Sequence, residues 1–244
     1  MQTAVSSPER LASWKPGVWR MVFPHGRAVL AGVTDRSGED ADVRALAPGA
    51  SALVWAEQVH GAGIAAIDTA QPAVNPIPGC DALTTDLPGV VLAVRAADCL
   101  PILAWDPIRR AVGLAHAGWR GLAAHLPSRL LMWMRHRYQS DPGDVWVAIG
   151  PSIRACCYEV GEAFPPQFGS FLREQDGRRM CDLIGCAAQQ VVEAGVPAGH
   201  LLDAGVCTAC DGLPAAAQAG TRWHSVRRDG QTAGRNVSFL AIRR

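Results

Sequence analysis

The chain has 244 residues, of which 49% are hydrophobic and 18% charged, and its formal net charge is only +1. This composition is typical of a folded globular protein and excludes an extensively disordered chain. The arginines are spread along the sequence and form no basic block, so the charge pattern argues against nucleic acid as a partner.

The length predicts one compact domain over residues 21–244, preceded by a tail over residues 1–20, because single cores grow to about 250 residues before chains divide. The first twenty residues lack the apolar stretch of a secretory signal, and no later stretch is apolar enough to span a membrane. We therefore expect a cytoplasmic protein with no membrane partner. In that reducing compartment, the eight cysteines should be core residues, metal ligands or nucleophiles.

Short apolar runs predict most of the strands in the first half of the chain. Residues 35–50 are polar and turn-rich, with no clear period. Residues 51–56 and 63–67 predict two strands joined by a tight turn that contains QVHG, and the prolines of residues 71–79 predict an extended loop. Cys99 stands between the first two of three further predicted strands, at 89–96, 101–106 and 110–116.

The second half of the chain mixes helical and strand patterns. Residues 122–138 have helical spacing of Leu, Met and Trp, and a regular helix should begin near Pro127 because proline is tolerated only in the first turn. The other expected elements are a strand at 145–150, a helix that ends near Phe168, a helix at 182–194, and a hairpin formed by 223–230 and 235–242. Since strands and helices do not strictly alternate, we predict a layered α+β fold.

Three residues of metal-binding type stand at the ends of predicted strands, beside small residues: His60 in QVHG, Cys99 in ADCLP and His116 in AHAGWRG. Zinc prefers imidazole nitrogen and thiolate sulfur, and a catalytic zinc keeps three protein ligands and one open position. The wide spacing excludes a zinc finger, whose ligands come in close pairs. Taken singly, each histidine could equally be a polar turn residue, and Cys99 an inert buried thiol.

Six strings occur in order along the chain: QVHG, CDALTTD, AADCLPILAWDP, VGLAHAGWRG, IGPSIRACCYEVG and RRDGQTAGRN. Together they resemble the YfiH-like laccase-domain family, and the resemblance covers residues 51–242. It implies a YfiH/CNF-like α+β fold, a single layered domain with mixed β-sheets and outer helices. It also implies that the metal ligands are His60, Cys99 and His116.

The family was first described as copper-containing polyphenol oxidases and is now understood as purine nucleoside enzymes. The chain has seven histidines and no His-x-His pair, whereas a multicopper oxidase binds its coppers largely through such pairs. Two His and one Cys could form one blue-copper centre, but further coppers would lack ligands. The resemblance therefore implies zinc rather than copper, and phosphorolysis of adenosine, inosine or guanosine to the base and ribose 1-phosphate, with adenosine deamination as a further activity.

Polar residues in the same strings are candidates for catalysis or for substrate binding. Asp81 and Asp98 could act as a base or hydrogen-bond a ligand imidazole, or they could cap turns. Gln58 could bind the purine or hold the QVHG turn. Phosphate binding needs arginine or backbone N–H donors, and the candidates, each of which could instead form a surface salt bridge, are Arg120, Arg227 and Arg228.

The remaining cysteine motifs predict no site. Cys156 and Cys157 are adjacent, so we expect their side chains to point in different directions and at most one to face a site. Cys207 and Cys210 form a CxxC motif with no second pair, and we expect a structural role for it.

Two other functions fit the sequence. Cys99 could be the nucleophile of a cysteine hydrolase with His116 as its base, an arrangement that occurs on a related fold in a bacterial toxin. The chain could also bind zinc without catalysing a reaction, because residues upstream of 51 lack the family's usual Gly-Gly-Val-Ser segment. Metal content, thiol reactivity and nucleoside turnover distinguish these functions.

Overall fold

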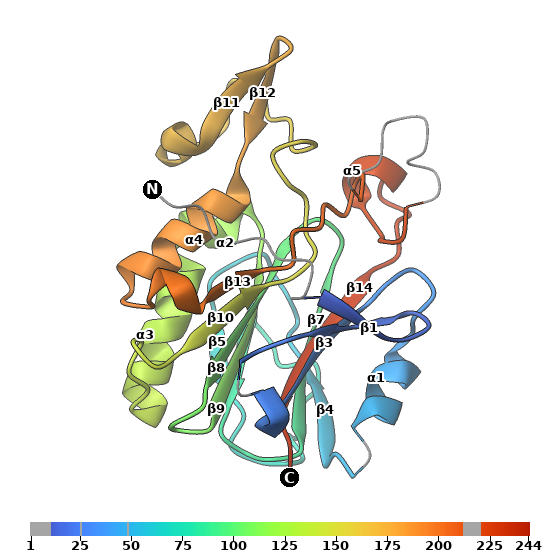
Figure 1. Cartoon of the computed structure of the whole chain (residues 1–244), viewed down its shortest axis with the longest axis vertical. Coiled ribbons are helices and arrows are strands. Elements are labelled where there is room, and N and C mark those ends of the chain that lie inside the picture. The colour runs from blue at the N-terminus through green and yellow to red at the C-terminus, as the bar shows by residue number, and fades with distance from the viewer. Residues whose placement is uncertain (1–10, 25, 48, 212–220) are drawn as a thin grey trace.

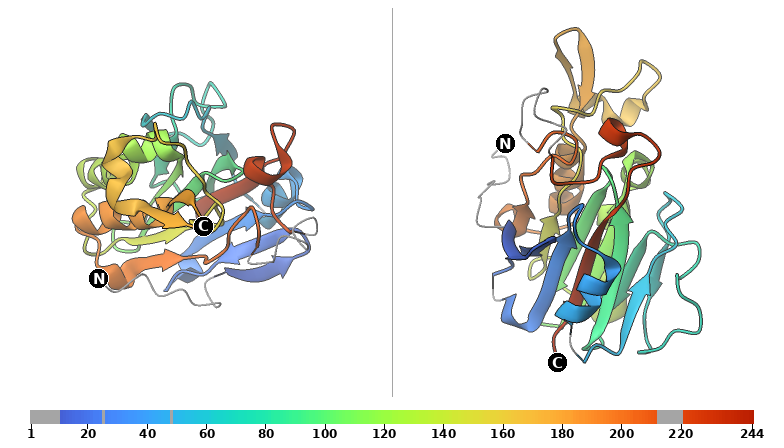
Figure 2. Two further views of the ribbon diagram at one scale, coloured as in Figure 1. Left: turned by 90° about the horizontal axis from the view of Figure 1, so that it is seen from above. Right: turned by 90° about the vertical axis from the view of Figure 1, so that its right-hand side faces the viewer.

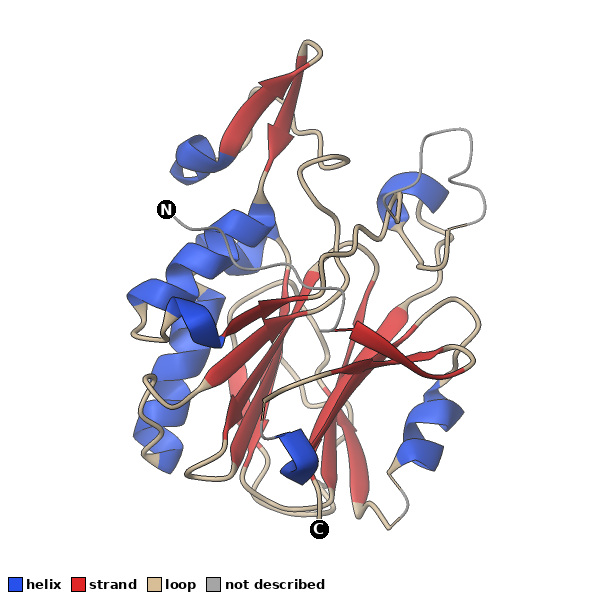
Figure 3. Cartoon of the chain, viewed as in Figure 1, coloured by secondary structure: helices blue, strands red, loops and turns tan. Residues whose placement is uncertain are grey.

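The computed structural model describes residues 11–24, 26–47, 49–211 and 221–244. Two six-stranded β-sheets lie face to face, and helices cover their outer faces (Figure 1, Figure 3). Each sheet contains parallel and antiparallel pairs, which confirms the expected α+β fold with mixed β-sheets and outer helices. No helix of the described residues is long and apolar enough to cross a membrane.

The first sheet combines strands from both ends of the described chain. In spatial order its strands are β1 (Leu11–Lys15), β2 (Val18–Met21), β3 (Val29–Thr34), β14 (Asn236–Ile242), β7 (Val90–Ala96) and β4 (Ala52–Trp55). β4 pairs with β7 in parallel, and the other neighbours are antiparallel. The outer face of this sheet packs against α1 (Asp40–Leu46), whose Val43 is fully buried.

The second sheet carries three helices on its outer face. Its strands, in spatial order, are β13 (Leu201–Asp203), β10 (Trp146–Ile149), β8 (Leu100–Asp106), β9 (Ala111–Ala117), β6 (Ala82–Thr85) and β5 (Ile64–Ala66). The covering helices are α2 (Trp119–Ala123), α3 (Leu126–Tyr138) and α4 (Leu183–Glu193). In Figure 1 these helices lie on the left of the sheets and α1 lies on the right.

Smaller elements lie outside the two sheets. They are 3₁₀ helices at Gly26–Ala28, Pro166–Phe171 and Ala198–His200, the hairpin of β11 (Leu172–Gln175) and β12 (Arg178–Cys181), and α5 (Val226–Asp229). The hairpin projects from one end of the molecule (Figure 2).

Alternate side chains of the central strands point into different cores. On β7, Leu92 packs into the core between the sheets, whereas Val91 packs toward α1. On β9, Leu114 lies in the core between the sheets and Ala115 lies under the outer helices. Because neighbouring side chains of a strand face opposite sides, both sides of these strands are buried. This accounts for the unbroken apolar runs in the sequence.

Several sequence predictions are confirmed. The strands expected at 89–96, 101–106 and 110–116 are β7, β8 and β9. The helix expected near Pro127 is α3, which has this proline in its first turn. The helix expected at 182–194 is α4, and the side chain of Asp182 caps it by accepting a hydrogen bond from the Gly185 N–H.

The predicted tail is wrong from residue 11 onward, and residues 1–10 lie outside the described residues. Residues 11–21 form the β1–β2 hairpin on the edge of the first sheet, and Val18 is fully buried there. Gly17 makes the turn with a φ of +78°, and a Cβ at this position would lie 2.8 Å from the Gly38 backbone nitrogen. Such turns favour glycine, which has no side chain to clash.

Other expected elements also differ. Residues 35–50 contain α1, whose polar first turn, closed by a capping box between Glu39 and Asp42, hides its short apolar face. The helix expected to end near Phe168 is also different: residues 150–165 contain no α-helix, and Phe168 lies in the 3₁₀ helix Pro166–Phe171. The segment 223–230 contains α5 and no strand, because the Ser225 side chain caps a helical turn there by accepting a hydrogen bond from the Arg228 N–H.

Candidate metal centre

The chain crosses from the first sheet to the second at two neighbouring points. One crossover joins β4 to β5 and carries His60, and the other joins β7 to β8 and carries Cys99. β4 and β7 are parallel neighbours, so both crossovers leave the first sheet at the same end. The two strands expected at 51–56 and 63–67 therefore form, as β4 and β5, but lie in different sheets and not in one hairpin.

The third candidate ligand, His116, is placed by strand register. It lies near the end of β9, directly opposite Pro101 of the antiparallel strand β8. Cys99 immediately precedes β8, so the register brings His116 to its side. The ligating atoms of His60, Cys99 and His116 all lie within 4.8 Å of one another. The two imidazole rings meet edge to face, with their centroids 4.9 Å apart.

Asp81 holds both histidines in place. Its Oδ1 atom lies 3.0 Å from His116 Nδ1 and also accepts a hydrogen bond from the His60 backbone N–H, at 3.0 Å. Its Oδ2 atom accepts a hydrogen bond of 2.7 Å from the Gly61 N–H. An Nδ1 that donates to a carboxylate leaves Nε2 of the ring free for a metal. His60 has a φ of +59°, and its backbone bond to Asp81 supports this uncommon conformation.

The charges of the site favour a thiolate at Cys99. Burial would raise the pKa of Cys99, but hydrogen bonds with His116 and His60 lower it to about 7. Burial would lower the pKa of His116, but hydrogen bonds to Asp81 and Cys99 raise it to about 9. Burial would likewise raise the pKa of Asp81, and its hydrogen bonds with His116 and Gly61 instead lower it. Thiolate is the form of cysteine that binds metals.

These residues fit a zinc ion. Two imidazoles and one thiolate are donors that zinc prefers, and three ligands leave one coordination position open. A Cβ atom at Gly118 would lie 3.0 Å from Cys99 Sγ and 3.7 Å from His60 Cδ2, so the absence of a side chain there keeps the space between the ligands free. His116 is only 3% exposed, whereas His60 is exposed and leaves one side of the site accessible.

Asp98 and Gln58 have other partners. The Asp98 carboxylate accepts hydrogen bonds from the Thr208 hydroxyl, at 2.8 Å, and from the Arg227 backbone N–H, at 2.7 Å. No hydrogen bond joins it to an imidazole of the described residues. The Gln58 side chain donates to the carbonyl and accepts from the N–H of Arg95, so it holds the QVHG turn, as one of its two expected roles required.

The three candidate arginines differ in their availability. The Arg228 guanidinium donates to Asp229 and to three backbone carbonyls, so its hydrogen-bonding capacity is used within the fold. Arg227 donates to the Glu159 carbonyl and lies 5.3 Å from the centre of the Tyr158 ring. Arg120 is exposed, lies over the Trp119 ring, and forms no ion pair with a described residue.

Aromatic side chains next to the ligands were not among the sequence candidates. Trp119 follows Gly118 directly and packs against Phe164, which also contacts Tyr158. Burial raises the pKa of the Tyr158 hydroxyl to about 12, and the charges of Cys181 and Cys99 add to this rise. The strings HAGW and CCYEV contain two of these residues, but nothing in the spacing of the sequence places them beside Cys99.

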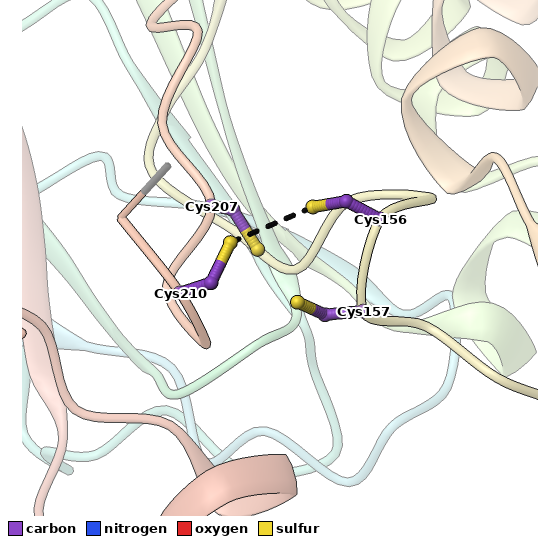
Figure 4. Close-up of side chains that lie close together, drawn as sticks. All are labelled: Cys156, Cys157, Cys207 and Cys210. Carbon is purple, nitrogen blue, oxygen red and sulfur yellow. Dashed lines mark hydrogen bonds between the residues drawn. The ribbon is translucent and has the colours of Figure 1, made fainter. Parts of the chain in front are cut away.

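The cysteines outside this site correct one expectation. The side chains of Cys156 and Cys157 point toward the same place, where they meet Cys207 and Cys210 (Figure 4). Adjacent residues point apart in a strand, but Cys156 and Cys157 lie in a turn where the N–H groups of Cys157 and Tyr158 both bond to the Arg154 carbonyl. The CxxC motif therefore does have a second pair of cysteines beside it.

The sequence and the fold of the chain are similar to those of known proteins. A family model described as multi-copper polyphenol oxidoreductase laccase matches residues 39–243. Purine nucleoside phosphorylase YlmD of Geobacillus stearothermophilus is 37% identical over 205 residues, which are 78% of this chain and 72% of that protein. The crystal structure of YlmD from Geobacillus stearothermophilus has a TM-score of 0.83 at 30% identity, and covers 96% of this chain and 99% of that chain.

Two further proteins extend the comparison. Adenosine deaminase RL5, from an unknown prokaryotic organism, is 30% identical over 203 residues, which are 77% of this chain and 74% of that protein. The crystal structure of the hypothetical protein YfiH from Bacillus licheniformis has a TM-score of 0.78 at 26% identity, and covers 96% of this chain and 99% of that chain. These similarities agree with the two-sheet fold described above.

Replacing Asp81 by Asn tests its part in the site. The amide has only one acceptor oxygen, so either His116 or a backbone N–H loses its partner, and we expect Zn²⁺ affinity to fall about 10-fold to 100-fold. Competition with a chromophoric chelator measures this affinity. Asp68→Asn is the matched control, because Asp68 is exposed and its one ion pair among the described residues is with Arg137. Equal affinities in the two variants would contradict the role of Asp81.

Proposed function

The chain belongs to the multi-copper polyphenol oxidoreductase laccase family, here called the YfiH-like laccase-domain family, and from this premise we propose that it is a zinc-dependent purine nucleoside phosphorylase. The names of its relatives support an enzyme of this family that processes purine nucleosides. The proposed reaction is phosphorolysis of adenosine, inosine or guanosine to the base and ribose 1-phosphate. The relative named adenosine deaminase supports deamination of adenosine as a further activity.

The observation that carries the proposal is the convergence of His60, Cys99 and His116 around one point, with Asp81 behind the two histidines. Zinc held by these three residues would supply Lewis-acid chemistry at its open coordination position. Asp81 would keep His116 in the tautomer that binds through Nε2. The bond from the His60 N–H to Asp81 would keep His60 facing the same point although its loop is exposed.

Zinc is favoured over copper by the donor set. Among the described residues, the clusters that could hold a metal bring together only two histidines, His60 and His116. A multicopper oxidase would need additional imidazole ligands for its other coppers. The family description contains the word copper, but the described residues of this chain offer no set of ligands for several copper ions.

Side chains beside the ligands would bind the substrate. Trp119 directly follows Gly118, which lies beside Cys99, and the charge of Cys99 acts on the Tyr158 hydroxyl. Purine bases stack well on aromatic rings such as these. Phosphate needs positively charged donors, and Arg120 is the candidate whose guanidinium forms neither an ion pair nor a hydrogen bond with described residues, whereas Arg227 donates to the Glu159 carbonyl. Arg228 is excluded from this role because backbone carbonyls and Asp229 occupy its donors.

The contacts between Asp81, His116 and Cys99 also suit the alternative of a cysteine hydrolase. A nucleophilic cysteine needs an adjacent base, and the base needs an orienting group. This alternative gives no role to His60, although its ring lies against His116 and its ligating atom lies within 4.8 Å of Cys99 Sγ. A metal site uses all three side chains, and we therefore prefer it.

Turnover of nucleosides tests the proposal directly. The purified full chain, loaded with zinc, is incubated with adenosine, inosine and guanosine, with and without phosphate, and the released base and ammonia are measured. We expect release of the base that depends on phosphate, and we expect Cys99→Ser to reduce this release to background. Cys186→Ala, which changes a buried cysteine of α4, is the control and should keep the activity. Bound zinc with no turnover of any nucleoside would instead support a non-catalytic zinc protein.

The thiol chemistry of Cys99 separates the metal site from the hydrolase. A Cys99 sulfur bound to zinc should resist iodoacetamide until a chelator removes the metal, because the metal occupies the attacking lone pair. Mass spectrometry of the peptide containing Cys99 measures the alkylation. Rapid alkylation of Cys99 in the zinc-loaded protein would contradict the proposed ligand role.

Replacing Arg120 by Ala tests the phosphate site. A hydrogen bond to a charged group contributes about 1.5–3 kcal/mol, so we expect the KM for phosphate to rise about 10-fold or more while the zinc content stays the same. Arg129→Ala is the matched control, because Arg129 is another exposed arginine, on α3. A KM for phosphate that changes equally in both variants would exclude Arg120 from phosphate binding.

A further inference from the structure

Four cysteines on two loops place their sulfur atoms around a second point (Figure 4). Cys156 and Cys157 lie on the loop after β10, and Cys207 and Cys210 lie on the loop after β13. β10 and β13 are parallel neighbours, so these loops leave the second sheet at the same end. The four ligating sulfur atoms lie within 4.8 Å of one another, and all four thiols are free of disulfide bonds.

We propose that Cys156, Cys157, Cys207 and Cys210 bind a structural zinc ion. Zinc with four cysteine ligands is tetrahedral, and a Zn–S bond of about 2.3 Å separates the sulfurs by about 3.8 Å. The Sγ atoms of Cys156 and Cys210 are 3.7 Å apart, which matches this spacing and is too long for a disulfide bond. Four thiolates fill the coordination sphere, so the site is structural and has no position for substrate.

The two loops hold this geometry through their own backbone bonds. The Thr208 N–H donates to the Ser152 carbonyl at 3.1 Å, and the Ser152 N–H donates to the Val206 carbonyl at 3.4 Å. The guanidinium of Arg228 donates to the carbonyls of Thr208 and Ala209, inside the CxxC turn. The protein therefore brings the four sulfurs together by contacts that do not involve the sulfurs themselves.

The four cysteines differ in their exposure to solvent. Cys207 is 3% exposed and Cys210 is 6% exposed, and both pack with Ile153 in a small apolar cluster. Cys156 is exposed, so an ion could reach the site from solvent.

This second site would brace the first one. The Thr208 hydroxyl donates to Asp98, and the Ile153 N–H donates to the Asp98 carbonyl. Asp98 immediately precedes Cys99, so the loops that carry the four cysteines also fix the backbone at one ligand of the first site. Zinc bound by the four cysteines would add a direct link between these loops to the backbone hydrogen bonds that already join them.

The metal content of the full chain tests the inference, and the test does not depend on enzymatic activity. We expect about two zinc ions per chain in the purified protein and about one in Cys99→Ala/His116→Ala, which lacks two ligands of the first site. X-ray absorption at the zinc edge of that variant should show four sulfur neighbours at about 2.3 Å. Cys207→Ser/Cys210→Ser should also lose one zinc, whereas Cys186→Ala should keep both.

Three results would overturn the inference. They are a Cys99→Ala/His116→Ala protein without zinc, zinc in that protein with nitrogen or oxygen neighbours, and iron or a Cys156–Cys210 disulfide in place of zinc. If Cys207→Ser/Cys210→Ser does not fold, the absorption spectrum of the first variant decides the question without it. Loss of nucleoside turnover with both zinc ions retained would count against the proposed function and leave the four-cysteine site standing.

Discussion

The buried carboxylate of Asp81 is the constraint on which the candidate metal centre depends. Asp81 is 0% exposed, and a charged group in that position is stable only when its oxygens are paired. Its partners are the His116 ring and the N–H groups of His60 and Gly61. One side chain thus joins a histidine on a rigid central strand to a histidine on an exposed crossover. Cys99 completes the group from the second crossover between the sheets.

The topology explains why both cysteine-containing sites lie near one another. Chain crossovers between the two sheets bring His60 and Cys99 to one end, and the parallel strands β10 and β13 direct their following loops toward Asp98. Asp98 therefore joins these loops to the segment of backbone that carries Cys99. It binds Thr208 of the CxxC loop and the Arg227 N–H of α5 while its own backbone leads directly into Cys99.

The sequence predicted the central strands and two long helices well because their apolar runs are long. It failed where stability comes from distant contacts: β1 and β2 pair at a sheet edge, and α1 is short and begins with a polar turn. The sequence named His60, Cys99 and His116 as candidate ligands because the strings around them resemble one family, and the structure brings their ligating atoms within 4.8 Å of one another. The convergence of Cys156 and Cys157 was missed because the conformation of a turn, unlike the alternation of a strand, is not visible in residue spacing.

The proposed function requires that His60, Cys99 and His116 share one zinc ion. Anomalous diffraction from a crystal of the zinc-loaded protein, measured on both sides of the zinc absorption edge, would locate this ion. We expect a peak bonded to all three side chains, with Asp81 against the far nitrogen of the His116 ring. No peak between these side chains, or a peak bonded to Cys99 alone, would contradict it.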